Sequence, residues 1–197
     1  DKAGNDSAEA LFGRAFVNPE NGPEPEIEGA PSYKENVYTF DYGSCRFVVM
    51  NNNYWWCSTA ERVGANLEGY VLEKQWAWLQ QVFKQAAEDP AIQHLFLLAQ
   101  EPMFPNDGHV GDAMWYHGGD PEKNGGIDRR YVVERRDEIW EAFVATGKAR
   151  AGIFGDEHNY SRTLIDASVN SRFTRPAWQF ISGGAGAPYH ARNPEVP

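Results

Sequence analysis

The sequence predicts an α/β fold built around a layered sheet, and two observations support this prediction. Segments with helical spacing of apolar residues alternate along the chain with short runs rich in β-forming residues. Such alternation is typical of a sheet covered by helices, with antiparallel hairpins at its edges. The 197 residues are 42% hydrophobic and 14% aromatic, which suffices for a substantial core. The length suits one domain or two small ones, and we expect a single domain over residues 1–197.

The expected elements begin with a proline- and glutamate-rich loop at residues 18–36. Residues 37–53 (VYTFDYGSCRFVVMNNN) contain two β-rich runs around a Gly-Ser pair, which predicts a hairpin. Apolar residues at three- and four-residue spacing predict helices over 67–88 and 129–149. Short apolar runs predict buried strands at 94–100, 149–154 and 178–188. The last of these runs ends in a glycine-rich turn.

The charge of the chain narrows the classes of partner. Its net charge is −10 and its isoelectric point is near 4.9, which argues against a nucleic-acid or anionic-membrane footprint. No apolar run approaches the roughly 20 residues that span a bilayer, so no membrane span is expected. A bound metal cation would offset part of the negative charge.

Two polar clusters directly follow predicted buried strands: AQEPMFPND (99–107) and GDEHNYSR (155–162). Ligands of open α/β sheets bind at the carboxyl ends of the strands, so we expect both clusters to face one site. Oxygen and imidazole groups in them suit divalent metals, and a cation would relieve repulsion between the acids. The alternative is an acidic surface loop, which is the commoner origin of an isolated Asp-x-His. The residues concerned are Gln100, Glu101, Asp156, Glu157 and His158.

Three further groups have both a functional and a structural interpretation. His109, Asp112 and His117 lie in the long loop at 101–127, where they contact a substrate or metal or simply belong to a polar surface. Trp55 and Trp56 either stack on a ligand ring or pack in the core. Four arginines near the second helix either bind phosphate or pair with Glu134 and Asp137 on a solvated face; they are Arg129, Arg130, Arg135 and Arg136.

Several stretches together resemble a known family. The chain contains no serine nucleophile elbow and no P-loop, which leaves metal-assisted hydrolysis as the leading enzyme class. In chain order the matching stretches are GNDS (4–7), LFGRAF (11–16), VYTFDYGSCRFVVMNNN (37–53), KQWAWLQQ (74–81), FLLAQEPMF (96–104), GIFGDEHNYSR (152–162) and FISGGAGAP (180–188). They resemble the second half of a calcineurin-like metallophosphoesterase of the purple acid phosphatase type. The resemblance implies a four-layer α/β/β/α sandwich whose N-terminal part is missing, and a two-metal hydrolase of phosphate esters.

The resemblance also implies a set of metal ligands. Asn5 matches the asparagine that bridges toward the metal, and Gln100 and Asp156 stand where the family has histidines. His158 keeps the second histidine of the GHxH motif. Carboxylate and carboxamide oxygens in place of imidazoles shift the preference from Zn or Fe toward Mg, Ca or Mn. We therefore expect a divalent cation, which is Mn, Mg, Ca, Zn or Fe.

Catalytic and substrate-binding roles follow from the same match. Asp6 stands where the family has its catalytic histidine, and its pKa would have to be raised for it to protonate a leaving group. His158 is the second candidate for proton transfer. Asn5 would orient the phosphate, and Tyr160 and Arg162 match residues that flank the pocket.

The resemblance implies a small-molecule phosphate ester as substrate, with phosphomonoesterase or phosphodiesterase activity. The alternative is a degenerate, non-catalytic relative that binds a ligand or partner on the same face. An Asp-x-His and a Gly-Asp would be expected upstream of the first matching stretch, and a sheet edge without those strands would favour a homo-oligomer. The compartment is not encoded in these features; a periplasmic or secreted location is one expectation.

Overall fold

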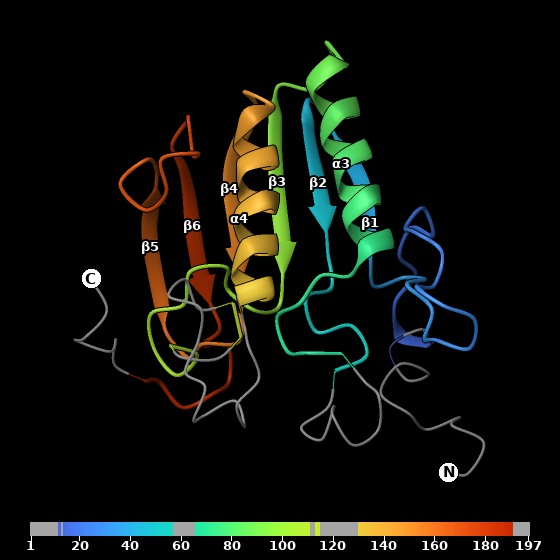
Figure 1. Ribbon diagram of the computed structural model, residues 1–197. Helices are drawn as coiled ribbons and strands as arrows, with labels where there is room; N and C mark the ends of the chain where they lie inside the picture. The colour runs from blue at the N-terminus through green and yellow to red at the C-terminus, as the bar shows by residue number, and fades with distance from the viewer. Residues whose placement is uncertain (1–11, 13, 57–65, 111–112, 115–129, 191–197) are drawn as a thin grey trace.

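The computed structural model describes residues 12, 14–56, 66–110, 113–114 and 130–190, and it contains a six-stranded sheet and two long helices (Figure 1). The strand order in the sheet is β1-β2-β3-β4-β6-β5. In the described part of the chain, no helix is long and apolar enough to cross a membrane.

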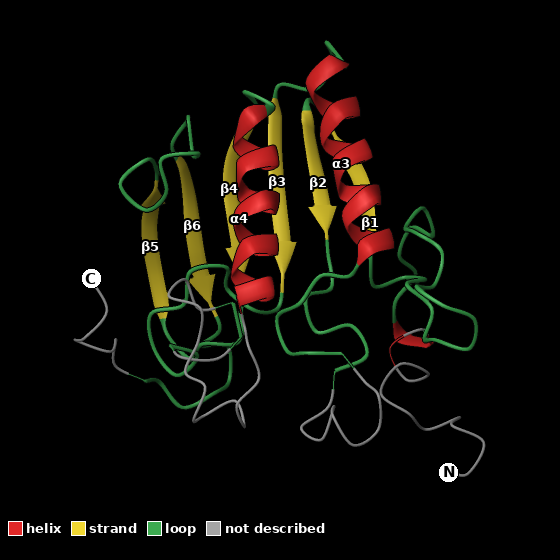
Figure 2. Cartoon of the chain, in the orientation of Figure 1, coloured by secondary structure: helices red, strands yellow, loops and turns green. Residues whose placement is uncertain are grey.

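The sheet is mixed, with a parallel centre and two antiparallel edges (Figure 2). β1 (Tyr38–Tyr42) and β2 (Cys45–Val49) form the predicted hairpin. β3 (His94–Ala99), β4 (Ala149–Phe154) and β6 (Ala177–Ser182) continue parallel to β2 and confirm the three expected strands. β5 (Tyr160–Ile165) was not predicted and pairs antiparallel with β6.

Both helices lie on the same face of the sheet, over the strands β1 to β4 (Figure 1). They are α3 (Glu73–Glu88) and α4 (Arg130–Ala145), and both fall within the ranges expected from the sequence. Alternate strand residues point toward them and form the main core. This core includes Val48, Leu95 and Leu97 from the strands and Leu79, Phe83, Ile139 and Phe143 from the helices.

α3 begins six residues later than the predicted range of 67–88. Gly69 has a φ of +75°, a left-handed conformation that interrupts a helix. The first turn of α3 is instead capped by a remote carboxylate: Glu26 accepts hydrogen bonds from the backbone N–H groups of Lys74 (3.0 Å) and Gln75 (3.0 Å). The loop over 18–36 is therefore confirmed, and it fixes where the helix starts.

The opposite face of the sheet is apolar and carries no helix from the described residues (Figure 1). Phe47 stacks between Phe40 (4.9 Å between ring centroids) and Phe96 (5.1 Å) across three neighbouring strands. Farther along the same face, Ile153 and Trp178 are 36% and 37% exposed. The described residues thus supply one sheet and one helical layer, which are two of the four expected layers.

Candidate functional site

The functional candidates gather at one end of the sheet, where the parallel strands β2, β3, β4 and β6 all terminate (Figure 1). Parallel strands bring their carboxyl ends to the same end of the sheet, so the loops that follow them meet there. This carboxyl end of the parallel strands, as distinct from the edge strands β1 and β5, is the edge that carries the site. The registers pair Leu98 of β3 with Ile153 of β4, just before the two polar clusters. The sequence-based expectation that both clusters share one edge is therefore confirmed.

Glu101 is held at this edge by two asparagines from the end of β2. The fully buried Asn52 donates to the Glu101 carbonyl oxygen (2.8 Å) and accepts from its backbone N–H (3.2 Å). Asn53 donates to Oε1 of Glu101 (2.8 Å). Oε2 of Glu101 is buried and accepts no hydrogen bond. Asn52 and Asn53 together thus position this one glutamate.

Burial raises the pKa of Glu101 to about 7. The negative charge of Asp156 adds to the rise, whereas the hydrogen bond from Asn53 opposes it. Burial therefore outweighs the neighbouring His109, which favours the charged form, and a proton or a metal cation would stabilise the carboxylate.

Asp156 joins the second polar cluster to the first. Its Oδ1 accepts a hydrogen bond from Nε2 of Gln100 (3.2 Å), and its Oδ2 lies 2.7 Å from Nε2 of His109. This contact with His109 is the main reason that the pKa of Asp156 is lowered. Asp156 adopts a φ of +64°, a left-handed conformation that aspartate tolerates better than most residues.

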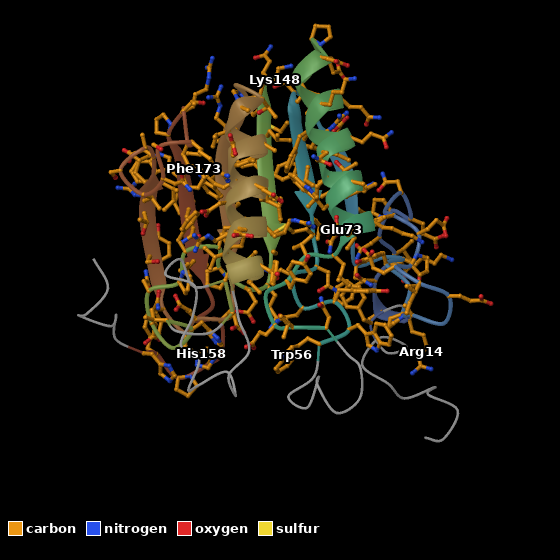
Figure 3. The ribbon with its side chains drawn as sticks, viewed as in Figure 1. Arg14, Trp56, Glu73, Lys148, His158 and Phe173 are labelled. Carbon is orange, nitrogen blue, oxygen red and sulfur yellow. The ribbon has the colours of Figure 1, made fainter. Side chains whose placement is uncertain are left out.

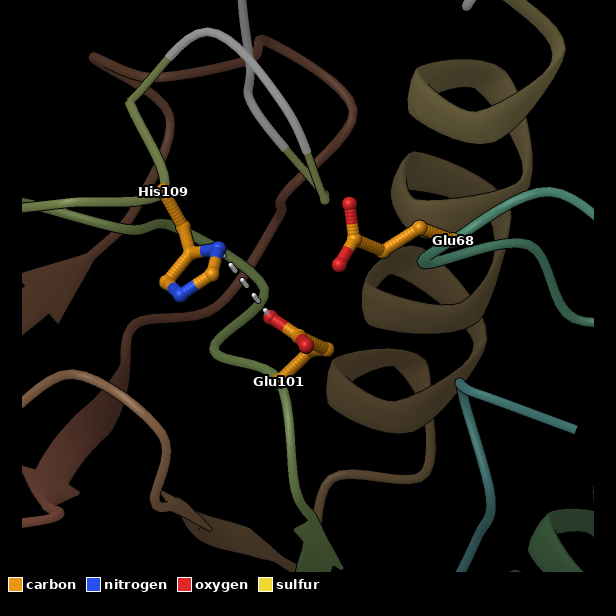
Figure 4. Close-up of side chains that lie close together, drawn as sticks. All are labelled: Glu68, Glu101 and His109. Atoms are coloured by element: carbon orange, nitrogen blue, oxygen red, sulfur yellow. Dashed lines mark ion pairs between the residues drawn. The ribbon is translucent and has the colours of Figure 1, made fainter. Parts of the chain in front are cut away.

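His109 and two glutamates form the tightest group of potential ligands among the described residues (Figure 4). One oxygen of Glu68, one of Glu101 and one nitrogen of His109 all lie within 4.8 Å of one another. Nδ1 of His109 is 3.9 Å from Oε2 of Glu101. Gly69 helps to place Glu68, because a Cβ at Gly69 would lie 2.7 Å from the backbone carbon of Ala113.

The sequence did not single out Glu68, because the segment that contains it was predicted as helix. The Asn-Leu-Glu-Gly stretch at 66–69 ends in a glycine, which is a turn signal that could have indicated otherwise. His109 was considered as a metal or substrate contact, and the structure places it in the site. Asp112 and His117 lie outside the described residues.

His158 lies at the same end of the molecule (Figure 3) but in a separate contact. Its ring packs against His190 with 4.8 Å between centroids, and its Nδ1 is buried without a hydrogen bond. Nδ1 of His190 is 3.4 Å from Oδ2 of Asp107. The structure thus groups His158 with residues that the sequence did not connect to it.

The other residues implied by the resemblance are placed as follows. Tyr160, at the start of β5, is 62% exposed. The guanidinium of Arg162 lies 4.7 Å from the ring centroid of Trp178, on the sheet face opposite α3 and α4. Asn5 and Asp6 lie outside the described residues.

Two structural interpretations made from the sequence are corrected by the structure. The pairing of an arginine with Asp137 is confirmed, but not on a solvated face: Arg136 is 2% exposed, and it donates to Asp137 (2.7 Å) and to the carbonyl oxygen of Met114 (2.9 Å). Of the two interpretations of Trp55 and Trp56, packing in the core is contradicted, because they are 37% and 41% exposed. Arg136 can be buried because its charge is paired with the adjacent Asp137. Trp55 and Trp56 are more exposed because they lie in the loop that follows β2.

Comparisons with known proteins yield a weak structural likeness. No protein-family model matches this chain, and no curated protein matches it. A solved structure described as "Structure of PhoD" resembles it with a TM-score of 0.46 and 13% sequence identity. The match covers 76% of this chain and 29% of that one, so the chain spans less than a third of that protein. At this level of similarity, no argument about this chain rests on the likeness.

Proposed function

We propose that this chain carries the active-site edge of a metal-dependent hydrolase of phosphate esters, with phosphomonoesterase or phosphodiesterase activity. The single observation that supports it is the meeting of Gln100 and Asp156, 3.2 Å apart, from the ends of two parallel strands. These are two of the positions at which the resemblance implies metal ligands. A catalytic edge assembled from separate strands is typical of α/β hydrolytic sites.

The donor set at this edge fits a divalent cation. It combines carboxylates with an imidazole, and Oε2 of Glu101 is buried without a hydrogen bond. The chemistry that a bound ion would supply is a lower pKa for water, so that hydroxide would be available for attack on phosphorus. The resemblance implies that Asn5, Gln100, Asp156 and His158 hold it.

We propose further roles for residues of this chain around the phosphate. His158 would transfer a proton to the leaving group, and Asp6 is the second candidate for that step. Asn5, Tyr160 and Arg162 would contact the phosphate ester, which the resemblance implies is a small molecule. Each role predicts a loss of turnover on substitution without a loss of folding.

We also propose that the chain forms a single domain that belongs to a four-layer sandwich. The apolar sheet face with Phe40, Phe47 and Phe96 supports this, because parallel sheets are normally covered on both faces. A second sheet packed there would complete the sandwich.

The rival function is a non-catalytic relative that binds a ligand at the same edge. The observation that favours it is the 2.7 Å contact between Oδ2 of Asp156 and Nε2 of His109, which already occupies one oxygen of a proposed ligand. Such a protein would fold and bind but would not turn over.

The test is hydrolysis of p-nitrophenyl phosphate and its bis ester by the purified chain, with and without a chelator. We expect turnover that chelation abolishes and that Asp156→Asn lowers at least tenfold. The exposed Glu88→Gln, in the last turn of α3, is the matched control. Chelator-insensitive turnover, or none with added Mn²⁺ or Zn²⁺, would contradict the hydrolase proposal.

A further inference from the structure

We infer that the cation at this edge is held by Glu68, Glu101 and His109, and that Asp156 and Gln100 position these ligands instead of coordinating the ion. This inference rests on the proposed function only for the use of a divalent ion. It replaces the ligand set implied by the resemblance with one that the structure assembles.

The first reason is geometric. Two donors that each lie about 2.1 Å from one ion are at most about 4.2 Å apart. Oε2 of Glu101 and Nδ1 of His109 are 3.9 Å apart, so an ion fits between them with little movement. The third donor is a carboxylate oxygen of Glu68, and all three donor atoms lie within 4.8 Å of one another (Figure 4). A small movement of the side chains would bring all three within bonding distance of one ion.

The second reason is that Glu101 presents one oxygen for an unidentified partner. Asn53 holds Oε1 at 2.8 Å, and Asn52 fixes the backbone through two hydrogen bonds. The side chain is 2% exposed, and Oε2 is buried with no hydrogen bond. Leaving a buried carboxylate oxygen without a partner is costly, and a cation at the side facing His109 removes that cost.

The third reason is the orientation of His109. Its Nε2 lies 2.7 Å from Oδ2 of Asp156, and a carboxylate at this distance favours the tautomer with the proton on Nε2. Nδ1 then faces Glu101 as the nitrogen suited to a metal. A carboxylate that orients a ligating histidine in this way is a recurrent second shell of metal sites. Gln100 in turn donates to Asp156 (3.2 Å), which fixes the orienting carboxylate.

The ligand types of Glu68, Glu101 and His109 favour some divalent ions over others. Two carboxylates and one imidazole suit first-row divalent ions such as Mn²⁺ or Zn²⁺, whereas Mg²⁺ and Ca²⁺ favour oxygen-only sites. Three protein ligands leave coordination positions for water or a phosphate oxygen. The site is therefore compatible with hydrolysis but does not require it.

The experiment is calorimetric titration of the full chain with Mn²⁺ and with Zn²⁺, without substrate, at pH 7.5. Glu101→Gln and His109→Gln should each weaken binding at least 100-fold, and Glu68→Gln about tenfold. Asp156→Asn should weaken it roughly 10- to 100-fold, as expected of an orienting residue. His158→Gln should leave it unchanged, as should the control Glu88→Gln on the helix surface. Circular dichroism establishes that each variant is folded.

Coordination itself is read by the d–d absorption of bound Co²⁺, whose bands should shift in position and intensity in His109→Gln because an imidazole ligand is lost. Loss of binding in His158→Gln with retention in Glu101→Gln would overturn the inference in favour of the ligands implied by the resemblance. Absence of binding at millimolar metal would also overturn it. Binding at this set without phosphate-ester turnover would contradict only the proposed function, while chelator-sensitive turnover that survives Glu101→Gln would contradict only this inference.

Discussion

Two buried glutamates at the same edge of the sheet have opposite local environments. Glu157, after β4, receives the backbone N–H groups of Asn106 (2.9 Å) and Asp107 (2.6 Å) and is 2% exposed. Glu101, after β3, is 1% exposed but receives one side-chain hydrogen bond and keeps one oxygen without a partner. Burial raises the pKa of both carboxyls.

The difference shows how a structural carboxylate is distinguished from a candidate ligand. Backbone donors satisfy Glu157, so its negative charge organises the loop at 106–107. The neighbours of Glu101 orient it and leave its second oxygen facing an imidazole. Burial alone therefore does not separate the two glutamates, whereas the number of hydrogen-bonded oxygens does.

The largest expected effect is on the satisfied glutamate. Glu157→Ala would leave the buried N–H groups of Asn106 and Asp107 without an acceptor, and each such group costs about 1–3 kcal/mol. We expect the free energy of unfolding to fall by about 3–5 kcal/mol, measured by urea denaturation. Glu157→Gln, which keeps one acceptor oxygen, should lose about half as much. A loss below about 1 kcal/mol for the alanine variant would remove the contrast between the two glutamates.

Glu101→Gln should instead raise the free energy of unfolding of the metal-free protein. The folded-state pKa of about 7 lies above the ordinary value of 4.5, so the native state loses stability as pH rises through this interval. Glutamine does not ionise and avoids that loss. We expect the variant to be more stable than the wild type by about 1–3 kcal/mol at pH 8, with a smaller difference at pH 5.

The measurement is urea denaturation at both pH values in the presence of a chelator. A variant that is less stable than the wild type at pH 8 would mean that Glu101 is a structural carboxylate like Glu157.

Asp156→Asn tests the opposite sign at the same edge. Its pKa is lowered, chiefly by His109, so the pair contributes stability above the ordinary pKa of 3.8 that is lost as pH falls through the lower folded-state value. We expect a loss of about 1 kcal/mol at pH 7, reduced by solvent because the side chain is 20% exposed. Thermal unfolding at pH 7 and near pH 3 should show the difference shrinking toward acid. A constant difference would indicate a packing defect instead.

The smallest effect on the free energy of unfolding is expected for an ion pair away from the carboxyl ends of the parallel strands. Asp41 accepts two hydrogen bonds from Arg46 (2.7 and 2.8 Å), and this contact lowers the pKa of Asp41. Because the Asp41 side chain is 43% exposed, Asp41→Asn should cost only about 0.2–1 kcal/mol at pH 7 and less in 1 M NaCl. Denaturation at two salt concentrations checks this. A cost that does not depend on salt would show that solvent exposure does not distinguish this surface pair from the pair of Asp156 and His109.

Much of the fold was predictable because its signals are local. Helical spacing, the Gly-Ser pair and the apolar runs predicted the hairpin, both helices and the parallel strands. β5 was missed because its first residues, Tyr160 to Arg162, belong to a stretch dominated by polar groups. The start of α3 was misplaced because its cap, Glu26, is 48 residues away from Lys74 along the chain.

The sequence by itself determined that polar and acidic groups follow two buried strands, and hence that Gln100, Glu101 and Asp156 share one edge. Only the tertiary structure decided which of these groups is satisfied. The partners of Glu101 and Glu157 come from positions 48 to 51 residues away in the chain, at Asn53 and Asn106. Hydrogen bonds require donors within about 3 Å, and such proximity between distant segments is set by strand register and loop packing, which no local pattern encodes.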